Sequence, residues 1–258
     1  MSAALADTGT MLRRNLVRAL RSGYWIYVVA IPIVILLLFV FVLGETLGAG
    51  ITGGDRTDYL VYVLPGIVLL AIAAGPQLTA ITVAQDMTEG IIARFRTMDI
   101  SRGAVLWGHV VANGLQQFLG LVVVVGLSLL LGYRSDASAL SWLSAAGVAA
   151  VLILAFSWLA VALGSVSKNI ESASNLPMPI MFLPFFGSSF VPTESMPGWL
   201  QWFADHQPFT PFTETMRALM EGTSPGASLW ATVAWAVVIG IVGYVWARVQ
   251  YERRSLRA

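Results

Sequence analysis

The chain has 258 residues; 57% of them are hydrophobic and 11% are charged. A typical soluble domain carries about 25% charged residues. A soluble fold of this size could not cover its surface with so few charged side chains, so a soluble enzyme is excluded. The net charge of +1 gives no concentrated basic surface for nucleic acid, and the absence of cysteine excludes disulfides, thiolate catalysis and iron–sulfur clusters. The histidines, His109 and His206, are far apart in the sequence, and we expect no metal site.

Residues 12–21 predict an amphipathic helix near the start of the chain. Leu12, Leu16 and Leu20 recur on one face, and arginines fall mostly opposite. Such a helix lies in the membrane surface with its arginines toward the headgroups; the alternative is a charged lead-in that only sets topology. The arginines of this expected entrance helix, within residues 1–23, are Arg13, Arg14, Arg18 and Arg21.

Six apolar runs follow, and crossing the hydrocarbon core of a membrane requires about 20 mostly apolar residues. They cover residues 25–43, 59–83, 104–131, 140–166, 176–191 and 229–247. The first run is too long for the apolar part of a cleaved signal peptide, so we expect it to remain as a span, and Pro32 predicts a kink in it. The chain is therefore expected to be an all-α integral membrane protein with a single transmembrane domain, residues 1–258, whose six spans lie within residues 25–247.

The fifth run is short and contains three prolines, so it predicts a broken span that re-enters the membrane from the outer side. Irregular backbone at membrane depth is tolerated only where protein or a water-filled cavity surrounds it. Residues 190–228 then combine prolines with tryptophans that favour the membrane interface, and Thr210 followed by Pro211 predicts the start of a helix that ends at Gly222. The residues that we assign to this outer segment are Pro192, Pro197, Trp199, Trp202 and Pro208.

The distribution of positive charge predicts the orientation. If the N-terminus is cytoplasmic, twelve of the fifteen lysines and arginines lie on cytoplasmic segments, and only Arg56, Arg134 and Arg217 lie on outer loops. This is the positive-inside bias of membrane proteins. An even number of spans also places the basic C-terminal tail, residues 248–258, in the cytoplasm.

Titratable groups, which catalysis and ion-coupled transport require, are not expected in the middle of any span. A phosphate-binding loop of the form G-x-x-x-x-G-K-[ST] is also missing, so any ATP would be hydrolysed by another polypeptide. Uncharged polar residues do occur along the second and third spans, and they either join helices by hydrogen bonds or line a path for an amphipathic substrate. The candidates for such a path are Gln77, Thr82, Asn113 and Gln117.

Two polar segments carry a resemblance to a known family. The stretch EGIIARFRTMDISRGAVLWGH, residues 89–109, and the stretch FVPTESMPGWLQWFADHQPFTPFTETMRAL, residues 190–219, resemble those of ATP-binding-cassette type-2 exporter permeases, particularly the daunorubicin-resistance-like permeases. Together with the six-span plan and the entrance helix, the resemblance covers nearly the whole chain.

The resemblance implies a permease of the bacterial inner membrane that moves a hydrophobic or amphipathic drug, antibiotic or lipid outward. It also implies a dimer, either of two identical copies or with a similar permease, that docks cytoplasmic ATPase subunits, and these subunits would bind ATP and magnesium. The loop between spans two and three would contact the ATPase through Glu89, Gly90, Arg94, Phe95 and Arg96. The alternatives are an ion-coupled secondary transporter and a membrane scaffold that transports nothing.

Overall fold

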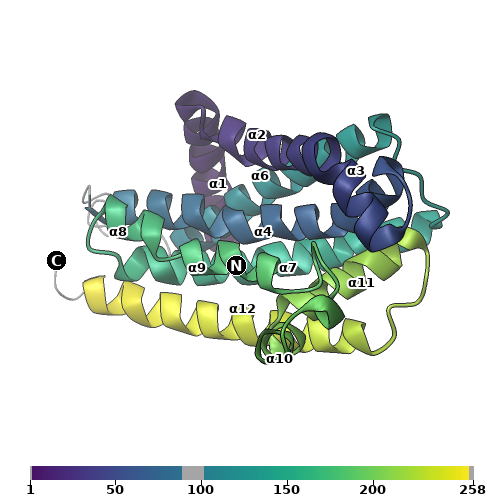
Figure 1. Cartoon of the computed structure of the whole chain (residues 1–258). Helices are drawn as coiled ribbons and strands as arrows, with labels where there is room; N and C mark the ends of the chain where they lie inside the picture. The colour runs from purple at the N-terminus through teal and green to yellow at the C-terminus, as the bar shows by residue number, and fades with distance from the viewer. Residues whose placement is uncertain (1, 89–101, 256–258) are drawn as a thin grey trace.

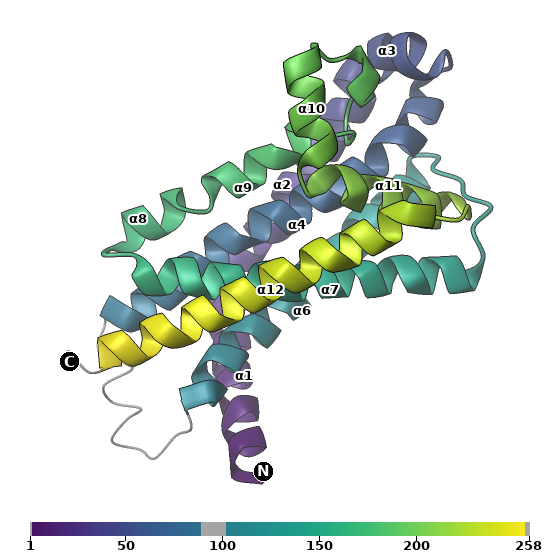
Figure 2. The same cartoon turned by 90° about the horizontal axis from the view of Figure 1, so that it is seen from below.

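The computed structural model describes residues 2–88 and 102–255, which form helices joined by short loops, with no β-strand among them (Figure 1). Five of the helical segments in this part of the chain are long and apolar enough to cross a membrane. They form one bundle, which Figure 2 shows from a second direction. The all-α membrane fold is confirmed, and the count of six spans stays a prediction because the fifth apolar run forms no single long helix.

The first helix, α1 (Ser2–Ser22), runs across the bundle and packs chiefly against α6 (Arg102–Leu130) (Figure 1). Met11 is buried in this contact, and a Cβ at Gly108 of α6 would lie 2.6 Å from the Cβ of Met11, so only glycine permits this close approach. Gly23 then adopts a φ of 71°, which glycine accepts without strain, and turns the chain into the next helix. The helix thus extends beyond the amphipathic stretch of residues 12–21 and lies within residues 1–23, and one of its faces packs on the bundle.

The first span is a continuous helical stretch that ends at Thr52, later than the apolar pattern predicts. Its parts are α2 (Tyr24–Leu37), the π-helical η1 (Leu38–Leu43), α3 (Gly44–Leu47) and the π-helical η2 (Gly48–Thr52). Gly48 lies directly against the start of the next helix, because a Cβ there would be 2.6 Å from the carbonyl oxygen of Asp55. Packing against that helix therefore holds the less apolar end of the stretch in place. Pro32 lies buried inside α2, and its kink stays a prediction.

The central helix of the bundle is α4 (Arg56–Thr88), which packs against α2, α6 and α7 (Ala139–Val166). Gly164 of α7 brings the two backbones close, since a Cβ there would lie 2.6 Å from the carbonyl oxygen of Ala80. The last helix, α12 (Gly226–Ser255), covers the other side of α7. Burial on all sides explains why α4 reads as a nearly continuous apolar run.

The fifth apolar run forms short pieces that lie along α4 (Figure 2). These pieces are α9 (Met178–Phe182) and the 3-10 helix η3 (Leu183–Phe186). The short α8 (Ile170–Asn175) precedes the run and also lies along α4. Pro177 precedes α9, and Pro184 lies in the first turn of η3. Proline cannot donate the backbone hydrogen bond that would continue a helix, so the run is interrupted at these positions, as predicted.

The segment after η3 folds over the end of the bundle that lies away from α8 (Figure 2). It contains η4 (Thr193–Ser195), α10 (Gly198–His206) and α11 (Phe209–Glu221). Gly222 ends α11 with a φ of 79°, as predicted. The helix begins at Phe209, two residues earlier than predicted. Thr210, predicted to cap the helix, is instead buried in its first turn and donates its hydroxyl to the carbonyl of Ala204 at 2.6 Å.

Arg217 of α11 joins this outer segment to α4. Its Nη2 donates to the carbonyl oxygen of Ser188 at 2.9 Å, and its guanidinium carbon lies 4.3 Å from the centre of the Tyr62 ring. Both contacts stabilise the positive charge of the Arg217 guanidinium, and the second does so through the quadrupole of the Tyr62 ring. Arg217 therefore lies half-buried within the helix that was predicted to end at Gly222.

Candidate functional site

A buried carboxylate lies at the end of α4, in a stretch that the apolar pattern predicts to be a loop. The helix continues to Thr88, and Asp86 in its last turn is 1% exposed. An isolated ionised carboxylate is very unfavourable away from water. The side chains around Asp86 therefore decide whether this position is stable.

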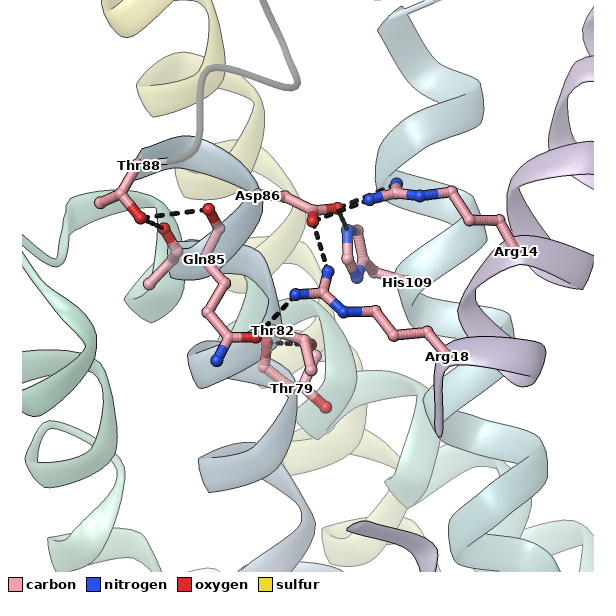
Figure 3. Close-up of polar contacts among 9 residues, drawn as sticks. Arg14, Arg18, Thr79, Thr82, Gln85, Asp86, Thr88 and His109 are labelled. Carbon is pink, nitrogen blue, oxygen red and sulfur yellow. Dashed lines mark hydrogen bonds and ion pairs between the residues drawn. The ribbon is translucent and has the colours of Figure 1, made fainter. Parts of the chain in front are cut away.

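Three basic side chains surround Asp86 (Figure 3). Arg14 of α1 forms two parallel hydrogen bonds, from Nη1 to Oδ2 at 3.0 Å and from Nη2 to Oδ1 at 2.9 Å. Arg18 donates from Nη1 to Oδ1 at 2.6 Å and from Nη2 to Oε1 of Gln85 at 2.9 Å. Nε2 of His109, on α6, lies 3.1 Å from Oδ2. We call Arg14, Arg18, Asp86 and His109 the Asp86 cluster.

Helical spacing on α1 explains how two arginines reach the same carboxylate. Arg14 and Arg18 are four residues apart, so they project from one face of the helix. The structure turns this pair toward α4, whereas Arg13 and Arg21 are exposed. Contact with lipid headgroups, which we predicted for all four arginines, therefore stays a prediction for Arg13 and Arg21. Arg14 and Arg18 instead bind Asp86.

The Asp86 cluster fixes the relative positions of three helices more than it adds net stability. Bidentate pairs between arginine and carboxylate are strong, but removing the charges from water offsets much of the gain. The Arg14 and Arg18 side chains keep 28% and 32% of their surface exposed, while the Asp86 side chain keeps 2%. Loss of either side of the pairing would leave charge without a partner in this junction of α1, α4 and α6.

Polar side chains continue from the cluster along the contact between α4 and α6. Thr82 donates its hydroxyl to the carbonyl of Thr79 at 2.9 Å, and Asn113 donates from Nδ2 to Oγ of Ser157 on α7 at 3.3 Å. A cavity of about 40 Å³ is lined in part by Thr82 and Asn113. This volume holds water but no drug-sized molecule. In the structure the two residues make hydrogen bonds within and between helices, and their contact with a substrate stays a prediction.

The other two candidates for a substrate path lie elsewhere. Gln117 is 3% exposed, and its carboxamide rests against Gly75 of α4, where a Cβ would collide with it. Gln77 donates from Nε2 to the carbonyl of Ser174 on α8 at 3.1 Å. It lines a cavity of about 320 Å³ between α2, α4, α8 and α9. The structure therefore does not bring the four candidates together in one cavity.

The predicted coupling residues lie outside the described part of the chain; they are Glu89, Gly90, Arg94, Phe95 and Arg96. The described part of the chain ends at Thr88 and begins again at Arg102. The segment that carries these residues is thus joined directly to the two helices that hold Asp86 and His109.

The predicted outer residues lie at the other end of the bundle, where α10 and α11 are found in Figure 2. Pro192, Pro197 and Pro208 each directly precede a helix, namely η4, α10 and α11. Trp199 and Trp202 of α10 are 76% and 65% exposed. Exposed tryptophans suit a membrane interface, and their distance along the bundle separates them from the Asp86 cluster.

Asp86 is the residue that reasoning from the sequence missed. The polar residues after residue 83 end the apolar pattern, and hydropathy does not distinguish a buried, paired carboxylate from a solvated one. The available signal is spacing: Asp86 follows Thr82 by four residues and Thr79 by seven, and so continues one face of the helix.

Comparison with known proteins gives one family match and two similar proteins. The model of the ABC-2 type transporter family matches residues 6–220. The daunorubicin resistance ABC transporter permease protein DrrB1 of Streptomyces coeruleorubidus is 32% identical over 198 residues, which cover 76% of this chain and 68% of that protein. The "probable doxorubicin resistance ABC transporter permease protein DrrC" of Mycobacterium tuberculosis (strain ATCC 25618 / H37Rv) is 27% identical over 258 residues, which cover 98% of this chain and 92% of that protein.

Proposed function

Because this chain belongs to the ABC-2 type transporter family, we propose that it is the permease through which a hydrophobic or amphipathic compound leaves the bacterial cell. Membership of the family makes it a transporter subunit rather than an enzyme, and it implies a separate ATP-binding-cassette ATPase as partner. In our proposal that ATPase binds ATP and magnesium. The names of the two relatives, which refer to daunorubicin and doxorubicin resistance, support an amphipathic drug as cargo.

The Asp86 cluster is the observation that carries the mechanism. The segment proposed to contact the ATPase begins three residues after Asp86 and continues into α6, which holds His109. A displacement of that segment would reach α4 directly, α1 through Arg14 and Arg18, and α6 through His109. We therefore propose that the cluster makes these helices move together when the ATPase pushes on the coupling residues.

We further propose that both chain ends are cytoplasmic. Figure 2 shows α8 and the C-terminal end of α12 toward one end of the bundle, and α3, α10 and α11 toward the other. The C-terminal end of α12, which carries Arg248, Arg253 and Arg254, lies at the first end, and this agrees with the positive-inside rule.

A second permease copy is proposed to pack on the face formed by α2 and the broken fifth run; a similar permease could take its place. Tyr27 and Ile31 of α2 are 62% and 44% exposed, and both line the cavity that contains Gln77. This cavity combines apolar walls with an amide and a carbonyl, so it suits an amphipathic compound. We propose it as part of the substrate path.

Copurification of the permease with its ATPase, followed by measurement of drug-stimulated ATP hydrolysis in vesicles, tests the proposal. We expect a stable complex, and we expect Glu89→Ala or Arg94→Ala to lower the stimulation about tenfold, within the usual range of coupling free energies. Glu194→Gln, an exposed change at the other end of the bundle, is the control and should leave stimulation unchanged. Absence of a complex, together with drug movement that needs no ATP, would instead support a secondary transporter.

A further inference from the structure

An apolar crevice lies between α6, α7 and α11, away from the cavity that contains Gln77. Its volume is about 320 Å³, and the residues that line it are aliphatic, aromatic, methionine or glycine. Small residues leave the space open, namely Gly126 on α6 and Ala145, Ala146 and Ala149 on α7. Met216 and Met220 close the side formed by α11.

The mouth of the crevice faces hydrocarbon rather than water. Val122 and Leu129, which line it, are 55% and 44% exposed, and they belong to a helix long and apolar enough to cross the membrane. Next to them Leu130 of α6 is 85% exposed, and on the neighbouring α7 Leu143 is 69% exposed. Side chains that line an unfilled apolar space lack dispersion contacts on that side. A lipid acyl chain that enters the space supplies these contacts, so its binding there is favourable.

The length of the crevice matches one leaflet of a membrane. Along α6 it extends from Phe118 to Leu129, which corresponds to about 16 Å at a rise of about 1.5 Å per residue. The hydrocarbon core is about 30 Å thick, so one leaflet contributes about half of that distance. One acyl chain therefore fits along the crevice without crossing the membrane centre.

A cation lies at the end of the crevice that is nearest the loop between α6 and α7. Nη1 of Arg134 donates to the carbonyl oxygen of Leu129 at 3.0 Å and to that of Tyr133 at 2.9 Å. A guanidinium has five N–H donors, so these two bonds leave donors that can face a phosphate. Trp142 lines the same end and meets the Tyr133 ring edge-on, with centroids 6.3 Å apart, which is the aromatic chemistry of the headgroup level.

We propose that this crevice binds one phospholipid, with an acyl chain along Gly126 and Ala146 and its phosphate on Arg134. The site is distinct from the proposed substrate path, which lies on α2, α4, α8 and α9. Because Met216 and Met220 belong to α11, the bound lipid also contacts the helix that covers this end of the bundle. Asp136 is exposed in the same loop, so the loop offers charges of both signs, as a zwitterionic headgroup does.

Photolabelling with a phosphatidylethanolamine that carries a diazirine in its acyl chain tests the site in membrane vesicles holding the full permease with its ATPase. We expect labelled peptides from residues 118–129 and 142–149. Gly126→Leu should fill the crevice, since nothing lies within 4 Å of a Cβ at this position. We expect it to lower the labelling about fourfold, which is the loss in affinity when the acyl chain buries one methylene group less. Gly147→Leu on α7 is the matched control, because a Cβ there also meets nothing within 4 Å, and it should label like the parent protein.

A second variant tests the headgroup contact. Arg134→Gln keeps an amide donor but removes the charge, and we expect it to lower the amount of copurifying phosphatidylethanolamine seen by native mass spectrometry about threefold, in keeping with one exposed ion pair. Equal labelling of the Gly126→Leu and Gly147→Leu variants would overturn the proposal. Loss of labelling when doxorubicin is added would also overturn it, because the crevice would then be a drug site. Since lipid labelling requires neither ATP nor transport, it can fail while the proposed function holds.

Discussion

The carboxylate of Asp86 accepts hydrogen bonds from two arginines of α1 and lies within hydrogen-bond distance of His109 on α6. Its 1% exposure leaves almost no room for water to replace a lost partner. A single substitution at this position therefore affects three helices at once.

Asp86→Asn removes the negative charge and leaves two guanidiniums without a carboxylate. Breaking a fully buried pair costs about 3–5 kcal/mol, and the partial exposure of both arginines reduces this to about 1–3 kcal/mol. We expect a lower melting temperature of the purified permease and weaker drug-stimulated ATP hydrolysis. Fluorescence-detected thermal unfolding and reconstituted ATPase activity measure the two effects.

Asp205→Asn is the matched control for this experiment, because Asp205 is exposed on α10 at the other end of the bundle. A double variant, Asp86→Asn with Arg14→Gln, should recover part of the lost stability, since it removes one of the unpaired cations. If Asp86→Asn matched the parent protein in both measurements, the Asp86 cluster would have no role in holding or coupling the helices.

At the scale of elements, glycine sets how closely α7 approaches its neighbours. Gly164 meets the backbone of α4 near Ala80, and Gly243 of α12 meets the backbone of α7, where a Cβ would lie 2.5 Å from the nitrogen of Leu159. Backbone atoms cannot move aside as a flexible side chain can. The layered contact of α4, α7 and α12 therefore depends on the absence of side chains at these positions.

Gly164→Ala should push α7 away from α4 and destabilise the bundle by about 1–3 kcal/mol, the usual cost of overpacking. Gly147→Ala in the same helix should raise stability by about 0.5–1 kcal/mol, because its Cβ would meet nothing and alanine favours helix. Thermal unfolding of both variants in one detergent checks the opposite signs. A melting temperature for Gly164→Ala at or above that of Gly147→Ala would contradict the close packing of α7 on α4.

At the scale of the whole molecule, we predict that the broken fifth run crosses the membrane. The chain has no cysteine, so any introduced cysteine is its only thiol. Lys168 precedes the run and Ser195 follows it, and both are exposed. These two positions therefore report the sides of the membrane on which the run begins and ends.

With a membrane-impermeant maleimide, we expect Ser195→Cys to be labelled in intact cells and Lys168→Cys only after the membrane is opened. Ser138→Cys, exposed at the start of α7, should behave like Ser195→Cys. This pattern would establish the sixth crossing and the cytoplasmic position of the Asp86 cluster. Labelling of Lys168→Cys and Ser195→Cys from the same side would mean that the run does not cross, and a fully reversed pattern would invert the proposed orientation.

The sequence by itself determined the membrane class, the long helices and the interruption of the fifth run. These features follow from local chemistry: about 20 apolar residues match the hydrocarbon core, and prolines such as Pro177 break a helix wherever they occur. The two polar stretches also sufficed to indicate the family that the comparisons then showed. The sequence did not determine the ends of helices, since α4 continues to Thr88 and the first span to Thr52.

Only the tertiary structure decided which polar residues meet. Thr82 and Asn113 lie beside the Asp86 cluster, whereas Gln77 faces a different cavity, although all four path candidates look alike in sequence. Asp86 read as part of a solvated loop because hydropathy averages over neighbours in the chain, while its burial depends on Arg14, 72 residues earlier, and on His109, 23 residues later. Contacts between distant residues depend on how helices pack, and local sequence patterns carry that information only where spacing continues a helical face, as it does from Thr79 to Asp86.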